Sequence, residues 1–158
     1  MDEKKRKEGI LFMKTIGFIG VGKMATAIIS GLDKNKFKII ISGHNLTKTQ
    51  KQAETLNVTA ASNHEELVQE SDFIILSVKP QVLPSVLSKL INHLTKDKKL
   101  VVIVMGSLGS KTINNLFKEI IPKFNNKNYE VIFITGKNYY DNYKNMEIPK
   151  NVKILPFV

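Results

Sequence analysis

The sequence predicts an α/β protein whose core is a doubly wound parallel sheet of about six strands. Short apolar segments alternate with amphipathic segments along the whole chain. Several apolar segments, such as FIILSV at 73–78 and LVVIVM at 100–105, show no polar alternation, which is typical of strands buried on both faces of a sheet. A glycine-rich turn joins the first apolar segment to the first amphipathic one. Together these observations predict a Rossmann-like three-layer sandwich.

The predicted strands are rich in Ile, Val and Phe and are bounded by glycine, proline or polar turns. They are expected at 14–20, 37–42, 73–78, 100–105, 130–135 and 152–155, with a possible short edge strand at 57–61. The predicted helices carry apolar residues at every third or fourth position. They are expected at 24–32, 47–56, 82–94 and 112–121, with a helical turn at 65–70 and a short helix at 139–145.

The composition predicts one folded domain. The 158 residues are 42% hydrophobic and 24% charged, enough for one core but too few residues for a two-domain enzyme. We expect residues 13–158 to form the domain and residues 1–12 to be a disordered leader. Cysteine is absent, which excludes disulfides, thiolate metal sites and a cysteine nucleophile. The apolar runs are too short to span a membrane, so we expect no membrane partner and a cytoplasmic protein.

The formal net charge of +10 suggests an anionic partner. Arg6 is the only arginine among the 24 basic residues. Lysine is a point charge and lacks the planar fork with which arginine grips guanine and phosphate. We therefore expect a solvated basic surface and no specific nucleic-acid function, whereas an anionic nucleotide remains compatible with this charge.

Residues 20–25, GVGKMA, follow the first predicted strand and open the first predicted helix. In this pattern Gly20 permits a tight turn, Gly22 lets the backbone approach a pyrophosphate, and Ala25 allows the helix to pack closely on the strand. The freed amides and the positive end of the helix would then hold the anion. The pattern therefore predicts dinucleotide binding, and a purely structural turn is the alternative.

The end of the second predicted strand bears on which dinucleotide binds. An acidic residue there would bind the ribose 2′-hydroxyl of NAD(H), but residues 42–48, SGHNLTK, contain none. Uncharged donors and a lysine favour NADP(H). The alternative for His44 is an exposed turn residue. His64 and His93 have no partner pattern and are expected at the surface, and the spacing of the three histidines predicts no metal site.

The segments GFIGVGKMATAIISGL and SNHEELVQESDFIILSVKPQVL resemble the amino-terminal domain of pyrroline-5-carboxylate reductase, over about residues 13–97. The resemblance implies NADP(H) as cofactor and the reduction of 1-pyrroline-5-carboxylate to proline by hydride transfer. It assigns no catalytic residue to this chain. It implies cofactor contacts from Ile19, Gly20, Val21, Gly22, Lys23 and Met24 at the pyrophosphate, from Ser42, Gly43 and His44 at the adenosine ribose phosphate, from Asn63 at the adenosine half, and from Ser77, Val78, Lys79 and Pro80 on the nicotinamide side. For Lys79 the alternative is a charged residue that simply leaves the core.

The segments VIVMGSLGSKTINNLFKEIIPKF, YEVIFITGKNYYD and NVKILPFV resemble a second family, over about residues 99–158. That family is the peptidoglycan glycosyltransferase that adds N-acetylglucosamine from its UDP sugar to lipid I, and the similarity is to its carboxy-terminal domain. The resemblance implies an alternative UDP-sugar site, with Ser107 near the phosphates and Val158 beside the uracil. One glycine of the family's Gly-Gly-Ser motif is missing before Ser107.

The two resemblances meet at the lysine-rich turn 96–99, which predicts a possible fusion seam near 96–100 and a recombined protein, natural or engineered. Neither the helical substrate domain of the reductases nor the acceptor domain of the transferases has a counterpart in the sequence. Three hypotheses stay open. The chain binds NADP(H) without turnover, it is a working reductase, or it is a chimeric fold that has no activity or keeps a remnant UDP-N-acetylglucosamine half-site. The sequence predicts no oligomeric state.

Overall fold

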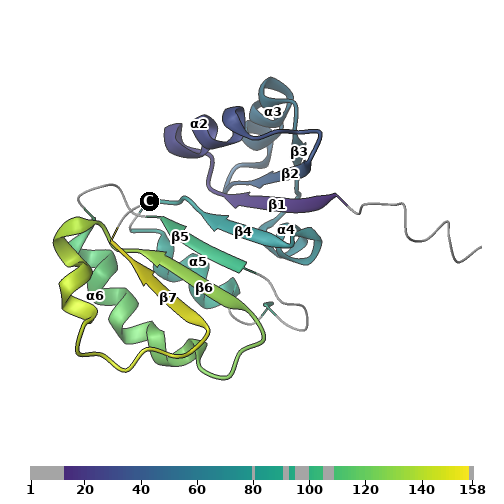
Figure 1. The fold of residues 1–158 in the computed structure, drawn as a ribbon. Coiled ribbons are helices and arrows are strands. Elements are labelled where there is room, and N and C mark those ends of the chain that lie inside the picture. The colour runs from purple at the N-terminus through teal and green to yellow at the C-terminus, as the bar shows by residue number, and fades with distance from the viewer. Residues whose placement is uncertain (1–12, 80, 91–92, 95–99, 105–108, 157–158) are drawn as a thin grey trace, which may run out of the picture.

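The computed structural model describes residues 13–79, 81–90, 93–94, 100–104 and 109–156. The predicted leader and seam therefore lie outside the described residues, except for residue 100. The described chain forms one sheet of seven parallel strands in the order β3-β2-β1-β4-β5-β6-β7 (Figure 1). The strands are β1 (Lys14–Ile19), β2 (Phe37–Ser42), β3 (Thr59–Ala60), β4 (Phe73–Leu76), β5 (Leu100–Val104), β6 (Glu130–Ile134) and β7 (Val152–Leu155).

The predicted fold class is confirmed. The sheet has seven strands rather than about six because the short edge strand β3 does pair with β2. The helices are α2 (Lys23–Gly31), α3 (Leu46–Leu56), α4 (His64–Glu70), α5 (Leu83–Leu90) and α6 (Lys111–Ile120), with 3-10 helices η1 (Ile121–Phe124) and η2 (Lys137–Tyr143). The short helix predicted at 139–145 is thus a 3-10 helix that begins earlier. No described helix is long and apolar enough to cross a membrane.

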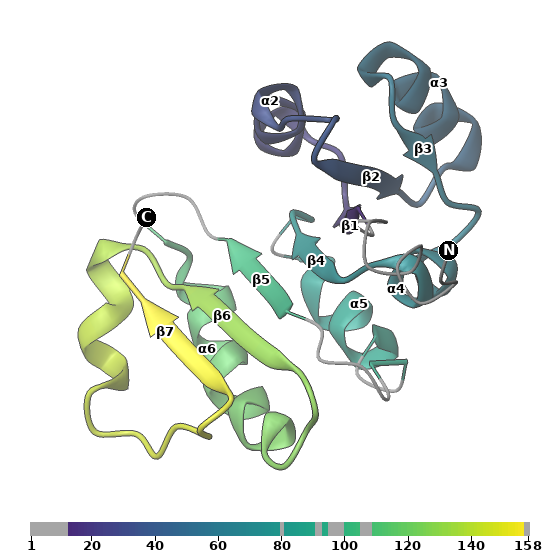
Figure 2. The ribbon, with the colours of Figure 1, turned by 45° about the vertical axis from the view of Figure 1, so that its right-hand side comes forward.

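The strand order reverses between β1 and β4, and the reversal divides the helices between the two faces of the sheet (Figures 1 and 2). On one face, Phe18 of β1 and Ile41 of β2 pack with Ala25 and Ile29 of α2. Helix α3 lies on the same side. On the other face, side chains such as Leu76 and Phe133 form the larger core with α4, α5 and α6. Right-handed crossovers require this division, because β1 leads outward in one direction and β4 in the other.

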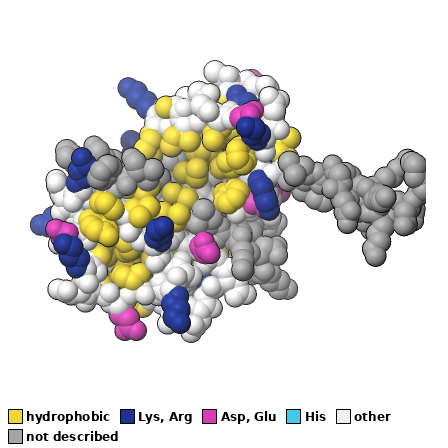
Figure 3. Space-filling model, in the orientation of Figure 1, with side chains coloured by type: hydrophobic (Ala, Val, Ile, Leu, Met, Phe, Trp, Pro, Cys, Tyr) yellow, Lys and Arg dark blue, Asp and Glu magenta, His cyan; other side chains and the backbone are white. Residues whose placement is uncertain are grey.

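One part of the sheet has a helix on only one side. Ile75, Val102 and Ile132 are aligned across β4, β5 and β6 on the same face as Phe18, and all three are only partly buried. No helix of the described chain lies over the β5–β7 part of this face, and Figure 3 shows hydrophobic side chains spread across it. Parallel sheets usually have both faces covered. The partly exposed surface of Ile75, Val102 and Ile132, called the half-covered face below, is therefore unusual.

Candidate functional site

An open cavity of about 490 Å³ lies at the carboxyl ends of β1, β2 and β4, at the point where the strand order reverses. Ligands of open α/β sheets bind at this kind of crevice. The loops after all three strands and the faces of α3 and α5 contribute to it. The lining residues are Gly20, Val21, Gly22, Gly43, His44, Asn45, Lys48, Thr49, Gln52, His64, Ser77, Val78, Lys79, Val82 and Val86.

Gly20 fixes the turn between β1 and α2. Its φ is +87°, and an added Cβ would lie 2.8 Å from Val78 Cγ1 and 2.9 Å from the Ser77 carbonyl oxygen. Its amide donates to the Ser42 carbonyl at 2.9 Å, and its own carbonyl accepts from Ser77 Oγ at 2.6 Å. The turn is therefore tied to both neighbouring strands, and only glycine adopts this conformation in so little space.

Gly22 leaves the amino end of α2 open. It occupies the N-cap position without a side-chain cap, and no atom lies within 4 Å of where its Cβ would be. By contrast, side chains of Asn45, Asn63 and Ser110 cap α3, α4 and α6. The first amides of α2 thus lack a side-chain acceptor, and the helix dipole adds positive potential there. This combination is suited to a phosphate group.

The ionisable side chains around the cavity are all potential cations. They are His44, Lys48, His64 and Lys79, and no acidic residue is among the described residues that line it. Lys48 belongs to the first turn of α3, where its amide donates to Asn45 Oδ1 at 2.9 Å. Gln52, one turn further along α3, donates from Nε2 to the Val21 carbonyl at 3.1 Å. Helix α3 thus contributes positive charge to the cavity through Lys48 and holds the glycine loop through Gln52.

His64 contributes a second contact between elements. Its Nδ1 lies 2.7 Å from Ser42 Oγ, and Ser42 is itself buried at the end of β2. Burial lowers the pKa of the His64 imidazole, an effect that Glu65 opposes and Lys89 reinforces. The expectation that His64 is a surface residue without a partner is wrong, because the ring lines the cavity. His93 is exposed, as predicted.

The structure brings eight of the predicted cofactor residues together around the cavity, which are Gly20, Val21, Gly22, Gly43, His44, Ser77, Val78 and Lys79. Ile19 is buried in the core beneath the loop, and Ser42 meets the cavity through His64. Lys23 lines a shallow hollow beside Gly22, and Met24 is exposed. Asn63 does not line the cavity, because its side chain accepts from the Glu66 amide at 2.8 Å. Pro80, Ser107 and Val158 lie outside the described residues.

Sequence reasoning missed several lining residues. Asn45, Thr49 and Gln52 face the cavity from α3 and its cap, and Val82 and Val86 face it from the start of α5. The spacing of residues 45, 48, 49 and 52 is that of one helix face. That face could have been recognised once the amino end of α3 was placed beside the glycine loop.

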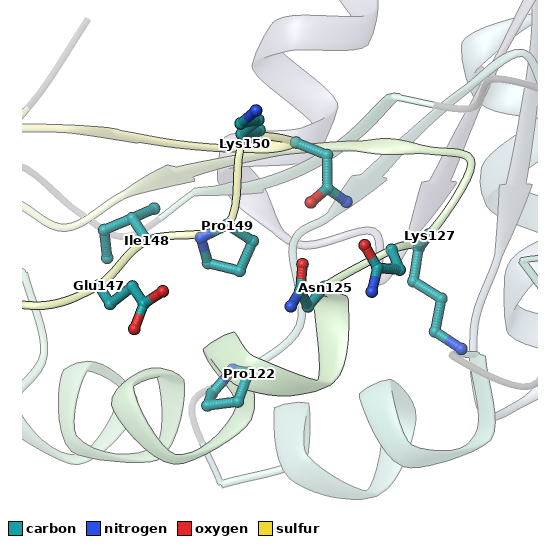
Figure 4. Close-up of a pocket in the computed structure, with 9 residues that line it drawn as sticks. Pro122, Asn125, Lys127, Glu147, Ile148, Pro149 and Lys150 are labelled. Atoms are coloured by element: carbon teal, nitrogen blue, oxygen red, sulfur yellow. The ribbon is translucent and has the colours of Figure 1, made fainter.

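A larger cavity, of about 710 Å³, lies at the opposite edge of the sheet, between the loops that precede β6 and β7. Figure 4 shows Asn125, Glu147 and Pro149 around it, with Lys127 directed away from Glu147. It combines an acid with lysines and has no glycine turn. Because it lies at the amino ends of the strands, it is on the wrong side of the sheet for a nucleotide site of this fold.

Near the carboxyl edge of the other half of the sheet, the described polar side chains of Asn114, Thr135 and Tyr143 are buried. Asn114 Nδ2 donates to the Thr135 carbonyl at 3.1 Å, and Tyr143 Oη donates to Asn114 Oδ1 at 3.0 Å. Thr135 Oγ1 lies 3.2 Å from the Leu155 carbonyl. Gly109 packs so closely that an added Cβ would overlap the Thr135 carbonyl oxygen. The described neighbours of the alternative UDP-sugar site are therefore closely packed.

The fold, the glycine turn and the position of the cavity define a Rossmann domain of the NAD(P)-binding type. Residues 15–106 match the family described as NADP oxidoreductase coenzyme F420-dependent, and the chain belongs to this family. Residues 100–158 match a second family, the glycosyltransferase family 28 C-terminal domain. Both resemblances predicted from the sequence are confirmed.

Comparisons with individual proteins also divide the chain into a reductase-like and a transferase-like segment. Pyrroline-5-carboxylate reductase of Glycine max is 38% identical over 116 residues, which cover 68% of this chain and 42% of that protein. The UDP-N-acetylglucosamine–N-acetylmuramyl-(pentapeptide) pyrophosphoryl-undecaprenol N-acetylglucosamine transferase of Bacillus cytotoxicus is 49% identical over 71 residues, 41% of this chain and 19% of that protein. The crystal structure of 1-pyrroline-5-carboxylate reductase from Streptococcus pyogenes is 36% identical with a TM-score of 0.51, covering 63% of this chain and 36% of that one. The chain thus spans less than half the length of each of these proteins.

Proposed function

We propose that the chain binds NADP(H) in the cavity between β1, β2 and β4. The observation that carries this proposal is an uncapped helix amino end in a cavity whose ionisable side chains are all potential cations. The diphosphate would lie against the amides that follow Gly22, where added atoms meet nothing within 4 Å. The nicotinamide side would lie against the loop of Ser77, Val78 and Lys79.

The preference for NADP(H) over NAD(H) rests on the loop after β2. Ser42, Gly43, His44 and Asn45 end this strand without an acid, and Lys48 lines the same part of the cavity. A carboxylate here would bind the ribose 2′-hydroxyl of NAD(H) and repel a 2′-phosphate. A lysine reverses that preference, because it attracts the phosphate and gives nothing comparable to a hydroxyl.

We propose binding without turnover of an imine. Hydride transfer requires a substrate held in a fixed geometry against the cofactor. Among the lining residues without a proposed cofactor contact, Val82 and Val86 beside the nicotinamide loop are apolar, whereas Asn45, Thr49 and Gln52 are polar. The side chains of these three polar residues already bond to backbone groups of the protein, so the proposal assigns none of them to an imine. Pyrroline-5-carboxylate reduction is the second candidate, favoured by the similarity to the reductases.

We also infer that the reductase-like and transferase-like segments join near residues 96–100, immediately before β5. The two family matches overlap over residues 100–106, so β5 fits both families. A strand buried on both faces needs little more than apolar side chains and a parallel neighbour on each side, which is why such a join is compatible with one continuous sheet.

Gly22→Asp tests the binding proposal because it should keep or raise the thermal stability of the protein while abolishing NADPH binding. Gly22 has the extended backbone of an ordinary N-cap, with φ −87° and ψ −174°. Aspartate there caps α2 and complements its dipole, so thermal stability should stay equal or rise slightly. The same carboxylate occupies the phosphate position, so NADPH binding, followed by its fluorescence, should disappear. Gly31→Ala, at the other end of α2 and also in open space, is the matched control and should bind normally.

The wild-type protein should show saturable NADPH binding and no thermal shift with UDP-N-acetylglucosamine. Absence of any saturable NADPH signal up to millimolar concentration would reject the proposal. A thermal shift with the UDP sugar alone would instead favour the remnant half-site. Oxidation of NADPH that depends on 1-pyrroline-5-carboxylate would show that the chain is a working reductase.

A further inference from the structure

Ser42 and His64 form a polar pair within the cavity that the glycine-loop pattern does not account for. Ser42 ends β2, and His64 is the first residue of α4. Ser42 Oγ and His64 Nδ1 are 2.7 Å apart, so the serine fixes the orientation of the imidazole. No described residue forms a hydrogen bond with Nε2, which leaves this nitrogen for a ligand. The ring shares the β2 side of the cavity with His44 and Lys48.

The charges around His64 determine how it titrates. On its own helix, Glu65 favours the protonated ring, whereas the Glu66 carboxylate is held by the Ser62 amide at 2.7 Å. From α5, Lys89 disfavours protonation. His44, Lys48 and Lys79 add potential positive charge from the other walls of the cavity. Burial is the largest cause of the lowered pKa, so the ring is mainly neutral at pH 7 before an anion binds.

We propose that His64 is a specificity-determining residue of the NADP(H) site, which donates a hydrogen bond from Nε2 to the ribose 2′-phosphate and becomes protonated when that phosphate binds. This inference rests on the proposed function. A phosphate beside the ring offsets the repulsion from Lys89 and favours the charged form. Binding then takes up a proton, so affinity rises as the pH falls through the pKa of His64 in the complex. NAD(H), which lacks the 2′-phosphate, should not show this dependence.

The test is calorimetric titration of NADP⁺ and NAD⁺ at pH 6.0, 7.0 and 8.0. Wild-type affinity for NADP⁺ should fall about tenfold across this range, within the limit of about a hundredfold that uptake of one proton sets over two pH units, while NAD⁺ affinity stays constant. His64→Gln keeps a donor of similar length but cannot titrate, so its NADP⁺ affinity should fall much less with pH. His93→Gln is the matched control, because His93 is exposed and outside the cavity, and it should behave like wild type. His44→Gln measures the contribution of the other histidine.

A second measurement separates this role from a merely structural one. Titration in buffers of different ionisation enthalpy counts the protons taken up on binding, and the count should drop in His64→Gln but not in His93→Gln. If His64→Gln binds NADP⁺ with the wild-type pH dependence and proton uptake, the role of His64 is rejected and the proposed function stands. If neither nucleotide binds the wild-type protein at any pH, both proposals fail.

Discussion

The two halves of this sheet use the same edge in opposite ways. In the reductase-like half, the carboxyl ends of β1, β2 and β4 surround an open cavity, and the loops are held by hydrogen bonds that leave the first amides of α2 uncapped. In the transferase-like half, the described polar side chains near the corresponding edge, Asn114, Thr135 and Tyr143, are buried and bonded within the protein. Parallel-sheet topology thus supplies the position of a site, while the hydrogen-bond partners of the nearby polar groups decide which of them can face a ligand.

The halves nevertheless share one backbone ladder. β4 pairs with β5 from Phe73↔Leu100 to Leu76↔Ile103, and β5 pairs with β6 from Leu100↔Glu130 to Val104↔Ile134. Burial follows the same alternation on both sides of β5, so that Ile74, Val101 and Val131 are all buried on the larger core. This continuity predicts that the halves unfold together, although only one of them is proposed to bind ligand.

The largest expected effect comes from truncating the core of the transferase-like half. Phe133 is fully buried and stacks on Phe117 with ring centroids 3.8 Å apart. Phe133→Ala should lower the free energy of unfolding in urea by about 3–5 kcal/mol. Ile132→Ala, on the adjacent and partly exposed position of the same strand, should cost clearly less. Equal losses for the two variants would mean that the half-covered face is buried after all.

The next effect tests whether the halves are coupled. All four tyrosines, Tyr129, Tyr139, Tyr140 and Tyr143, follow β5, and the protein has no tryptophan, so tyrosine fluorescence reports on the transferase-like half alone. NADP⁺ at about 100 times its dissociation constant should stabilise the fold by about 2.7 kcal/mol. The tyrosine melting curve should therefore move upward by about 5–10 °C. In Gly22→Asp it should not move, and an unmoved wild-type curve despite measured binding would show that the halves unfold separately.

Asn114→Leu tests the buried hydrogen bonds near the edge of the transferase-like half. The substitution keeps the volume but removes the Asn114 side chain that the buried Thr135 carbonyl and Tyr143 Oη contact, while Tyr143 Oη keeps the backbone carbonyl of residue 114 at 2.9 Å. Stability should fall by about 1–3 kcal/mol, measured by urea unfolding, and NADP⁺ affinity should be unchanged in the remaining folded protein. Asn115→Leu, the exposed neighbour on α6, is the control and should be near neutral. A loss of affinity in Asn114→Leu would contradict the separation of the two edges.

The smallest effect concerns the preference of the cavity for NADP⁺ over NAD⁺. Lys48→Gln should weaken NADP⁺ binding about tenfold, as expected for the loss of one charge-assisted contact, and leave NAD⁺ binding nearly unchanged. Lys51→Gln, on the same helix but outside the cavity, should bind both nucleotides as the wild type does. Equal weakening by both variants would mean that the general positive field, and not a local contact, attracts the nucleotide.

Most of the sheet could be predicted from the sequence because the buried strands are uninterrupted apolar runs, as in β4 and β5. The edge strand β3 pairs over only Thr59 and Ala60, so its short, polar surroundings gave a weak signal. The glycine turn was also predictable, because the positive φ and close packing of Gly20 give a local steric reason for glycine there. The Ser42–His64 pair was not, since its partners are 22 residues apart and meet only through the arrangement of β2 and α4. For the same reason the Asn114–Tyr143 hydrogen bond, which spans 29 residues, left no local pattern.

The half-covered face bears on how the purified protein will behave. Ile75, Val102 and Ile132 form a row of branched aliphatic side chains that are only partly buried in the folded state. An environment-sensitive dye such as anilinonaphthalene sulfonate should therefore fluoresce with the native protein, a signal usually ascribed to loosely packed intermediates. Dye fluorescence alone should not be taken as a sign of incomplete folding here, and dye-based melting curves will start from a high baseline.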